Sequence, residues 1–220
     1  MKPHIASLTL LCLALMLPAS AQVLYDNGPI NGTTDAWTIN YGYIVGDTFT
    51  LLNNSTVTGF NFGLWEFPGD VLSSVQWSVS SEFPPSGTIY GSGTASGSNL
   101  TDQFISVNQY GYDIDKITVT GLNVNLTSGP TYWFSLQNAM VPSGDPVYWD
   151  ENSGVGCKGD NGMGGGCPSE ALETGGTILS ESFDINGTSG GGQTPEPSDF
   201  VLFGSGVLCV AGLLRRKLQL

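Results

Sequence analysis

The alternation in residues 74–80 places the strongest constraint on the fold. Val75, Trp77 and Val79 alternate with polar residues over this segment. Successive side chains of a strand point to opposite faces, so the pattern predicts a strand with one buried face. Segments rich in β-branched and aromatic residues recur along the chain between turns of Gly, Asn, Asp and Pro. They predict further strands at residues 36–39, 47–52, 56–62, 88–93, 104–107, 116–120, 131–137 and 178–185.

The region 22–186 shows neither a sustained helical period nor a capping box. Many short strands joined by such turns are typical of an all-β, antiparallel β-sandwich, and we expect a jelly-roll-like one. The pair Asn53-Asn54 is expected to close a hairpin between two of these strands. Residues 131–137 place Tyr132 and Phe134 on one face and Trp133 on the other, which indicates a strand covered on both faces.

The N-terminus has the order of a secretory signal peptide. Lys2 and His4 precede an apolar run at residues 5–17, and Ala19-Ser20-Ala21 forms a small-residue cleavage site. This order of charged, apolar and cleavage regions predicts export and removal of residues 1–21. The exported domain then spans residues 22–186, and a Gly-rich linker follows at residues 187–194.

The C-terminus, residues 195–220, carries a second routing signal. Pro195-Glu196-Pro197 precedes an apolar run at 200–214, and Arg215, Arg216 and Lys217 follow it. The run is shorter than the about 20 residues of a permanent span, but as a helix it can enter a bilayer, and the basic cluster holds its end on the cytoplasmic side. Together these features resemble the PEP-CTERM sorting signal of Gram-negative bacteria. The resemblance implies transient anchoring, recognition by an exosortase at the membrane, and delivery to the cell surface or extracellular matrix.

The charge of the chain excludes several classes of function. The net charge is −13, and between residues 22 and 194 there is no Arg or His, and the cations are Lys116 and Lys158. Such a surface repels phosphate, which argues against a nucleic-acid partner and against docking to anionic headgroups. Without His, a Ser-His-Asp triad and a His-ligated zinc site are excluded as well. A glycosidase that uses carboxylates alone remains as the catalytic alternative.

Two cysteines fall within the exported domain. Cys157 and Cys167 flank a short segment rich in glycine. Because disulfides persist outside the cytoplasm, we expect these residues to form a disulfide that closes a surface loop. The alternative is a metal pair, but two thiolates without His supply half of a zinc site.

An acidic stretch surrounds this loop. It contains four carboxylates that could act as oxygen ligands for a structural calcium ion, the one cofactor that the sequence suggests: Asp145, Asp150, Glu151 and Asp160. Their spacing does not match an EF-hand, and a solvated acidic loop is the alternative that we favour. Asp150 and Glu151 are adjacent, so in a strand they point to opposite faces and do not flank one glycosidic bond.

Several aromatic residues lie in or beside turns, where an exposed flat ring can stack on a sugar; the alternative is that they fill the core. They are Trp37, Tyr41, Tyr43, Trp65 and Trp149. From the sequence we therefore expect an exported, exosortase-sorted protein of structural or binding character without catalysis. A carbohydrate-binding module for extracellular polysaccharide is the first alternative, and the carboxylate-only glycosidase is the second.

Overall fold

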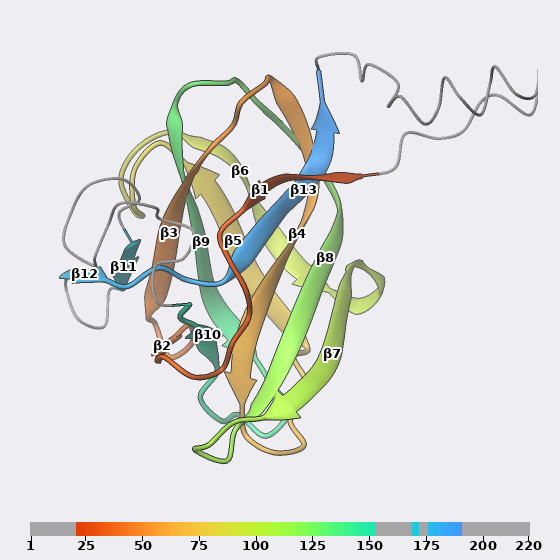
Figure 1. The fold of residues 1–220 in the computed structure, drawn as a ribbon, viewed down its shortest axis with the longest axis vertical. Helices are drawn as coiled ribbons and strands as arrows, with labels where there is room; N and C mark the ends of the chain where they lie inside the picture. The colour runs from red at the N-terminus through yellow and green to blue at the C-terminus, as the bar shows by residue number, and fades with distance from the viewer. Residues whose placement is uncertain (1–20, 153–168, 172–175, 191–220) are drawn as a thin grey trace, which may run out of the picture. The chain divides into compact units, whose positions relative to one another are not determined.

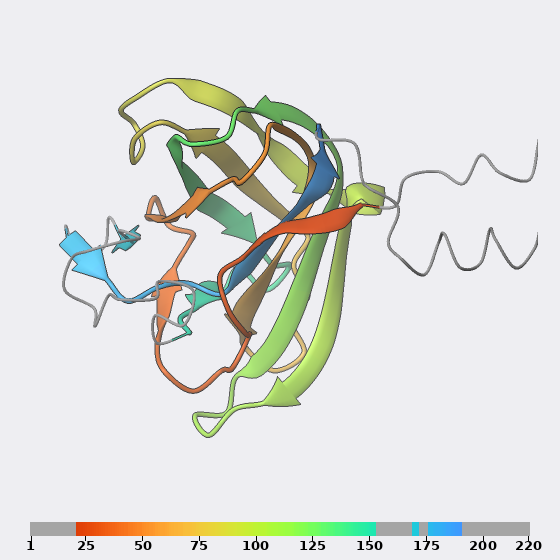
Figure 2. The same ribbon diagram turned by 45° about the horizontal axis from the view of Figure 1, so that its top comes forward.

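The computed structural model describes residues 21–152, 169–171 and 176–190. Their strands form two antiparallel sheets that pack face to face, consistent with the predicted β-sandwich (Figures 1 and 2). The first sheet contains β1 (Gln22–Asp26), β2 (Ala36–Thr38), β4 (Ser55–Glu66), β7 (Leu100–Val107), β8 (Asp113–Leu126), β10 (Tyr148–Asp150) and β13 (Phe183–Ser189). The second contains β3 (Ile44–Thr50), β5 (Ser74–Ser80), β6 (Ile89–Ser96), β9 (Thr131–Met140), β11 (Ser169–Ala171) and β12 (Gly176–Ile178).

Strand β4 organises the first sheet. One of its edges pairs with β8 along its whole length, and β7 extends the sheet beyond β8 (Figure 1). Its other edge pairs with β13 and, further along, with β10. Strand β13 pairs in turn with β1, and β10 pairs with β2. A bulge interrupts the β4–β8 ladder at Gly59, where an added Cβ would lie 2.3 Å from the carbonyl oxygen of Val119. Only glycine permits this close approach of the two backbones.

The core lies between the sheets. Phe62 of β4 pairs with Phe183 on one side and with Ile117 on the other, which gives a continuous apolar row. Across the interface, the ring centroids of Phe60 and Phe134 are 4.6 Å apart. These side chains are all buried, and their burial is the main driving force for folding.

The structure confirms the strand at residues 74–80 and its buried residues Val75, Trp77 and Val79. It also confirms that Trp133 is covered, because the ring of Phe83 packs against it from outside the core. The remaining predicted strands have counterparts whose ends differ by a few residues. In the described part of the chain, no helix has the length and apolar character needed to cross a bilayer.

Three boundaries were predicted wrongly. Asn53-Asn54 does not close a hairpin, because β3 and β4 belong to different sheets and the pair joins them. Residues 178–185 divide between β12 and β13, with an interruption at residues 179–182. Strand β13 continues to Ser189, so the domain extends beyond residue 186 and the predicted linker at 187–194 begins inside a strand. Pairing with β4 as far as Ser55 explains this extension.

Candidate functional site

A hollow of about 320 Å³ opens where β4, β10 and the β7–β8 connection meet. Aromatic rings supply more than half of its lining, which consists of Thr34, Asp35, Ala36, Trp65, Tyr110, Tyr112 and Tyr148. Its volume is at the lower end of the range of ligand pockets, about 300 to 1,000 Å³. The hollow is therefore large enough for a small ligand or for one unit of a polymer.

The β7–β8 connection holds two tyrosines over this hollow. The Oδ1 atom of Asn108 accepts hydrogen bonds from the backbone N–H groups of Tyr110, at 2.9 Å, and Tyr112, at 3.0 Å. Gly111 lies between the tyrosines with a φ of 86°, a conformation that favours glycine. The sequence Asn-Gln-Tyr-Gly-Tyr thus forms a side-chain-stabilised turn that presents both rings on the same side.

Trp65 forms the floor of the hollow, and the tyrosines pack on it. The ring of Tyr110 stacks on Trp65 with centroids 5.7 Å apart and an interplanar angle of 26°. Tyr112 contacts Trp65 and meets the ring of Tyr148 edge-on at 5.7 Å. Because Tyr110 is 59% exposed, much of its ring remains open to a ligand. A flat, exposed ring held by its neighbours is a surface on which the apolar face of a sugar can stack.

Asp150 fixes the floor in place. Its carboxylate accepts hydrogen bonds from the backbone N–H groups of Asn31 and Gly32, each at 2.9 Å, and from Nε1 of Trp65 at 2.6 Å. Gly32 has a φ of 64°, and an added Cβ would lie 2.6 Å from Cγ1 of the buried Ile114, so this position favours glycine. Burial raises the pKa of Asp150, and the three donors oppose that shift.

A second buried carboxylate, Asp47, lies between Val45 and Phe49 on the core-facing side of β3. It accepts hydrogen bonds from side chains of Asn27 and Ser180, each at 2.8 Å, and from backbone N–H groups of Glu181 and Thr48, at 2.9 and 2.6 Å. Burial nevertheless raises the pKa of Asp47 to about 7. We call Asp47 and Asp150 the tied carboxylates, because donors of the protein hold both of them.

The neighbouring Glu181 differs from the tied carboxylates. It is fully buried, and neither of its oxygens receives a hydrogen bond. Burial, and then the charge of Glu151, raise its pKa well above the usual value.

The predicted calcium residues do not form the expected solvated loop. Asp150 and Glu151 are buried, and Nε1 of Trp37 donates to Glu151 at 3.1 Å, so a solvated acidic loop is the wrong description for these two residues. Asp145 is half-buried and accepts a hydrogen bond from Asn40 through its backbone carbonyl. These members do not converge as ligands on one point. Asp160 lies outside the described residues, as do Cys157 and Cys167, so the complete calcium site and the disulfide stay predictions.

The predicted sugar-contact residues are dispersed. Trp149 is fully buried and donates from Nε1 to the carbonyl oxygen of Ser182 at 2.9 Å, so it belongs to the core and the prediction is wrong for it. Trp37 is half-buried, while Tyr41 and Tyr43 are exposed but do not line the hollow. Trp65 alone of the set lines it, although little of that residue is exposed.

Sequence reasoning missed Tyr110, Tyr112, Tyr148 and Asp35. Tyr110 and Tyr112 flank a glycine in a turn, which is the same criterion that selected Tyr41 and Tyr43 around Gly42. The two turns differ in what lies beneath them, and the sequence does not reveal that difference.

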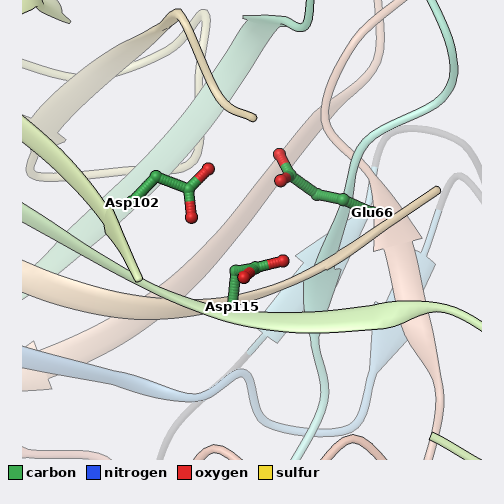
Figure 3. Close-up of side chains that lie close together, drawn as sticks. All are labelled: Glu66, Asp102 and Asp115. Atoms are coloured by element: carbon green, nitrogen blue, oxygen red, sulfur yellow. The ribbon is translucent and has the colours of Figure 1, made fainter. Parts of the chain in front are cut away.

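One group of three carboxylates lies close enough together to hold a metal ion among the described residues. It consists of Glu66 of β4, Asp102 of β7 and Asp115 of β8, which we call the acidic triad. Figure 3 shows the three carboxylates pointing toward one another. One oxygen from each lies within 4.8 Å of the others.

The residues of the C-terminal signal, Pro195, Glu196, Pro197, Arg215, Arg216 and Lys217, lie outside the described part of the chain. Comparison of the chain with protein-family models and with curated protein sequences finds no match.

Proposed function

We propose that this chain is an exported cell-surface or matrix protein whose β-sandwich domain binds a glycan in the aromatic hollow. The observation that carries the proposal is the open ring of Tyr110, stacked on Trp65 and flanked by Tyr112 and Tyr148. Sugars present an apolar face and a rim of hydroxyl groups, so a site for them needs flat rings together with hydrogen-bonding groups. Asp35 and Thr34 supply polar groups beside the rings.

Binding accounts for this lining better than hydrolysis does. Glycoside hydrolysis uses two carboxylates about 5 to 10 Å apart across one bond. The described residues that line the hollow include a single carboxylate, that of Asp35. The acidic character of the chain also favours a neutral polysaccharide over an anionic one, because like charges repel across an interface.

Direct measurement of glycan binding tests this proposal. We expect the purified protein to bind neutral polysaccharide, and Tyr110→Ala to weaken binding about tenfold, the cost of removing a central aromatic contact. Tyr41→Ala is the matched control, since Tyr41 is also an exposed turn tyrosine but lies outside the lining. If Tyr41→Ala weakens binding and Tyr110→Ala does not, the glycan site is elsewhere.

The proposed route to the surface rests on the two terminal signals. We infer that residues 1–21 direct export and that residues 195–220 anchor the chain until an exosortase releases it. Replacing Pro195-Glu196-Pro197 with three alanines should leave export intact and trap the protein in the membrane fraction. Normal release of that variant would exclude the sorting proposal without affecting the glycan proposal.

The jelly-roll-like description of the sandwich also belongs to this proposal. Its support is that the chain changes sheet at several connections, among them β3 to β4, β4 to β5, β6 to β7 and β8 to β9. Such crossings distinguish a jelly roll from two separate meanders.

A further inference from the structure

The acidic triad lies on the core-facing side of the first sheet. Asp115 pairs with Leu64, which is fully buried, and Glu66 follows Leu64 by two residues on the same face. Asp102 pairs with Ile117, which also faces the core. Three strands therefore bring three carboxylates to one face, the face that also carries apolar side chains of the core.

Within this layer, two members of the triad have oxygens without donors. Glu66 is fully buried and neither of its oxygens receives a hydrogen bond; the same is true of Oδ2 of Asp115, whose side chain is also buried. Asp102 accepts a hydrogen bond from the backbone N–H group of Leu72 at 2.7 Å and a second one from the protonated side chain of Glu66. A buried carboxylate without a donor or a counter-charge is strongly unfavourable, so the triad requires compensation.

The described part of the protein does not supply this compensation. Lys116 is the one Lys, Arg or His within residues 21–152, 169–171 and 176–190. It follows Asp115 directly on β8, so its side chain points to the opposite face of the sheet. There burial raises the pKa of Asp184, a residue of β13, and the charge of Lys116 partly offsets that rise. Within the described residues, protons and a bound cation are the sources of positive charge that remain.

Protons compensate the triad when no cation is present. Burial, followed by the charges of Asp102 and Asp115, raises the pKa of Glu66 to about 9. Burial and the charges of Asp102 and Asp113 raise the pKa of Asp115 to about 7.

We propose that the acidic triad binds a calcium-sized divalent cation. Calcium is bound by oxygen ligands at about 2.3 to 2.6 Å, so ligands on opposite sides of it are about 4.6 to 5.2 Å apart. The triad oxygens lie within 4.8 Å of one another, so one calcium ion can contact all three. Magnesium fits less well, because it requires near-ideal octahedral geometry and gives up its water ligands reluctantly. Asp102 is half-buried, which leaves a side open for the ion and its water ligands.

The bound ion has a defined structural consequence. It joins β4, β8 and β7, and through the bond from Leu72 to Asp102 it also fixes the connection at residues 67–73. Most side chains of β7 are exposed. The ion would therefore attach β7 to the sheet in a way that these side chains do not. This calcium site is different from the predicted set of Asp145, Asp150, Glu151 and Asp160, and it does not depend on the glycan proposal.

Calorimetric titration of the chelator-treated full chain with calcium chloride tests the proposal. We expect one ion per chain and a melting temperature roughly 3 to 6 °C higher in saturating calcium than in sodium chloride of equal ionic strength. Magnesium should bind more weakly. The variants Glu66→Gln and Asp102→Asn should each weaken calcium binding at least tenfold.

Asp184→Asn is the matched control, because it removes a half-buried acid of the same sheet from the opposite face. It should bind calcium as the wild type does. An equal effect of calcium on the wild type and on Glu66→Gln would show diffuse screening of the net charge and would overturn the proposal. A rise in melting temperature with magnesium but not with calcium would also overturn it. So would a rise with calcium that is no larger than the rise with sodium chloride of equal ionic strength.

Discussion

The tied carboxylates and the acidic triad are both buried, yet the protein treats them in opposite ways. Asp150 receives three hydrogen bonds and Asp47 receives four, several of them from backbone N–H groups of loops. Glu66 receives none. The tied carboxylates thus complete the protein's own structure, whereas the triad has acceptors to which no group in the described part of the chain donates, and which a proton or a bound cation can satisfy. Burial alone does not distinguish the tied carboxylates from the acidic triad. The supply of donors, together with the convergence of three carboxylates on one point, does.

The largest expected effect comes from Asp150→Asn. The amide keeps the shape of the side chain but places an NH₂ group among N–H donors, so at least one buried donor loses its acceptor. Hydrogen bonds to charged groups contribute about 1.5 to 3 kcal/mol each, and we expect a loss of about 3 kcal/mol in the free energy of unfolding. Denaturant titration measures this loss. A loss below about 1 kcal/mol would show that the loop at residues 28–34 does not depend on this carboxylate.

The second-largest expected effect is the pH dependence of the free energy of unfolding that the carboxyl of Asp47 causes. Burial raises the pKa of this carboxyl from its ordinary value of 3.8 to about 7 in the folded protein. Below about pH 4 both the folded and the unfolded state hold the proton, so the shifted pKa does not lower the free energy of unfolding. As the pH rises from about 4 through 7, the folded state alone retains the proton, so stability falls. The full shift corresponds to an upper limit of about 4 kcal/mol, and we expect about half of that between pH 4.5 and 7.5.

Melting curves at constant ionic strength, in chelator, check this dependence. The carboxyl of Glu181 lies beside Asp47 and its pKa is shifted in the same direction, so it adds to the slope of the wild type. Asp47→Asn should therefore flatten the slope without removing it. The difference between the two slopes is independent of whatever stability the substitution itself costs. Identical slopes would mean that Asp47 is ionised in the fold throughout this range.

The strands that the sequence predicts well are those whose pattern is local. The alternation in residues 74–80 needs no knowledge of the partner strands, and neither does the apolar row of β9. The sequence did not predict strand β10. Its three residues form a strand because they pair with β2 and β4, and the polar and aromatic residues around them show no alternating pattern. Tertiary pairing, and not propensity, defines such a short element.

The candidate sites depend on register, which the sequence does not show. Glu66, Asp102 and Asp115 come from three strands, and they converge because Asp115 lies opposite Leu64 in β4 and beside Phe104 in β7. A shift of one residue in either pairing would turn a carboxylate to the other face. Asp47 did carry a local signal, since it interrupts the alternation of Val45 and Phe49 on the buried side of β3.

Glu66→Gln sharpens the comparison because its expected sign is opposite to that of Asp150→Asn. In chelator at pH 7 the substitution removes an acid that must hold a proton against its normal tendency to ionise. We expect a gain of about 1 kcal/mol in the free energy of unfolding, because Gln is neutral in both states and folding no longer has to take up a proton at this position. A loss of stability in chelator would mean that Glu66 is satisfied by the protein, and the distinction between the two groups of acids would fail.

The smallest expected effect is that of Asp184→Asn, which tests whether any half-buried acid of the first sheet behaves as the triad does. Asp184 lies between the inward-facing Phe183 and Ile185, so its side chain points away from the core. It accepts a long hydrogen bond of 3.4 Å from Asn61, is attracted by Lys116 and is repelled by Asp26. Because these interactions are weak and partly cancel, we expect the free energy of unfolding to change by less than about 0.5 kcal/mol, with or without calcium. A larger change in denaturant titration would show that partial burial of an acid in this sheet affects stability by itself, independently of the number of donors around it.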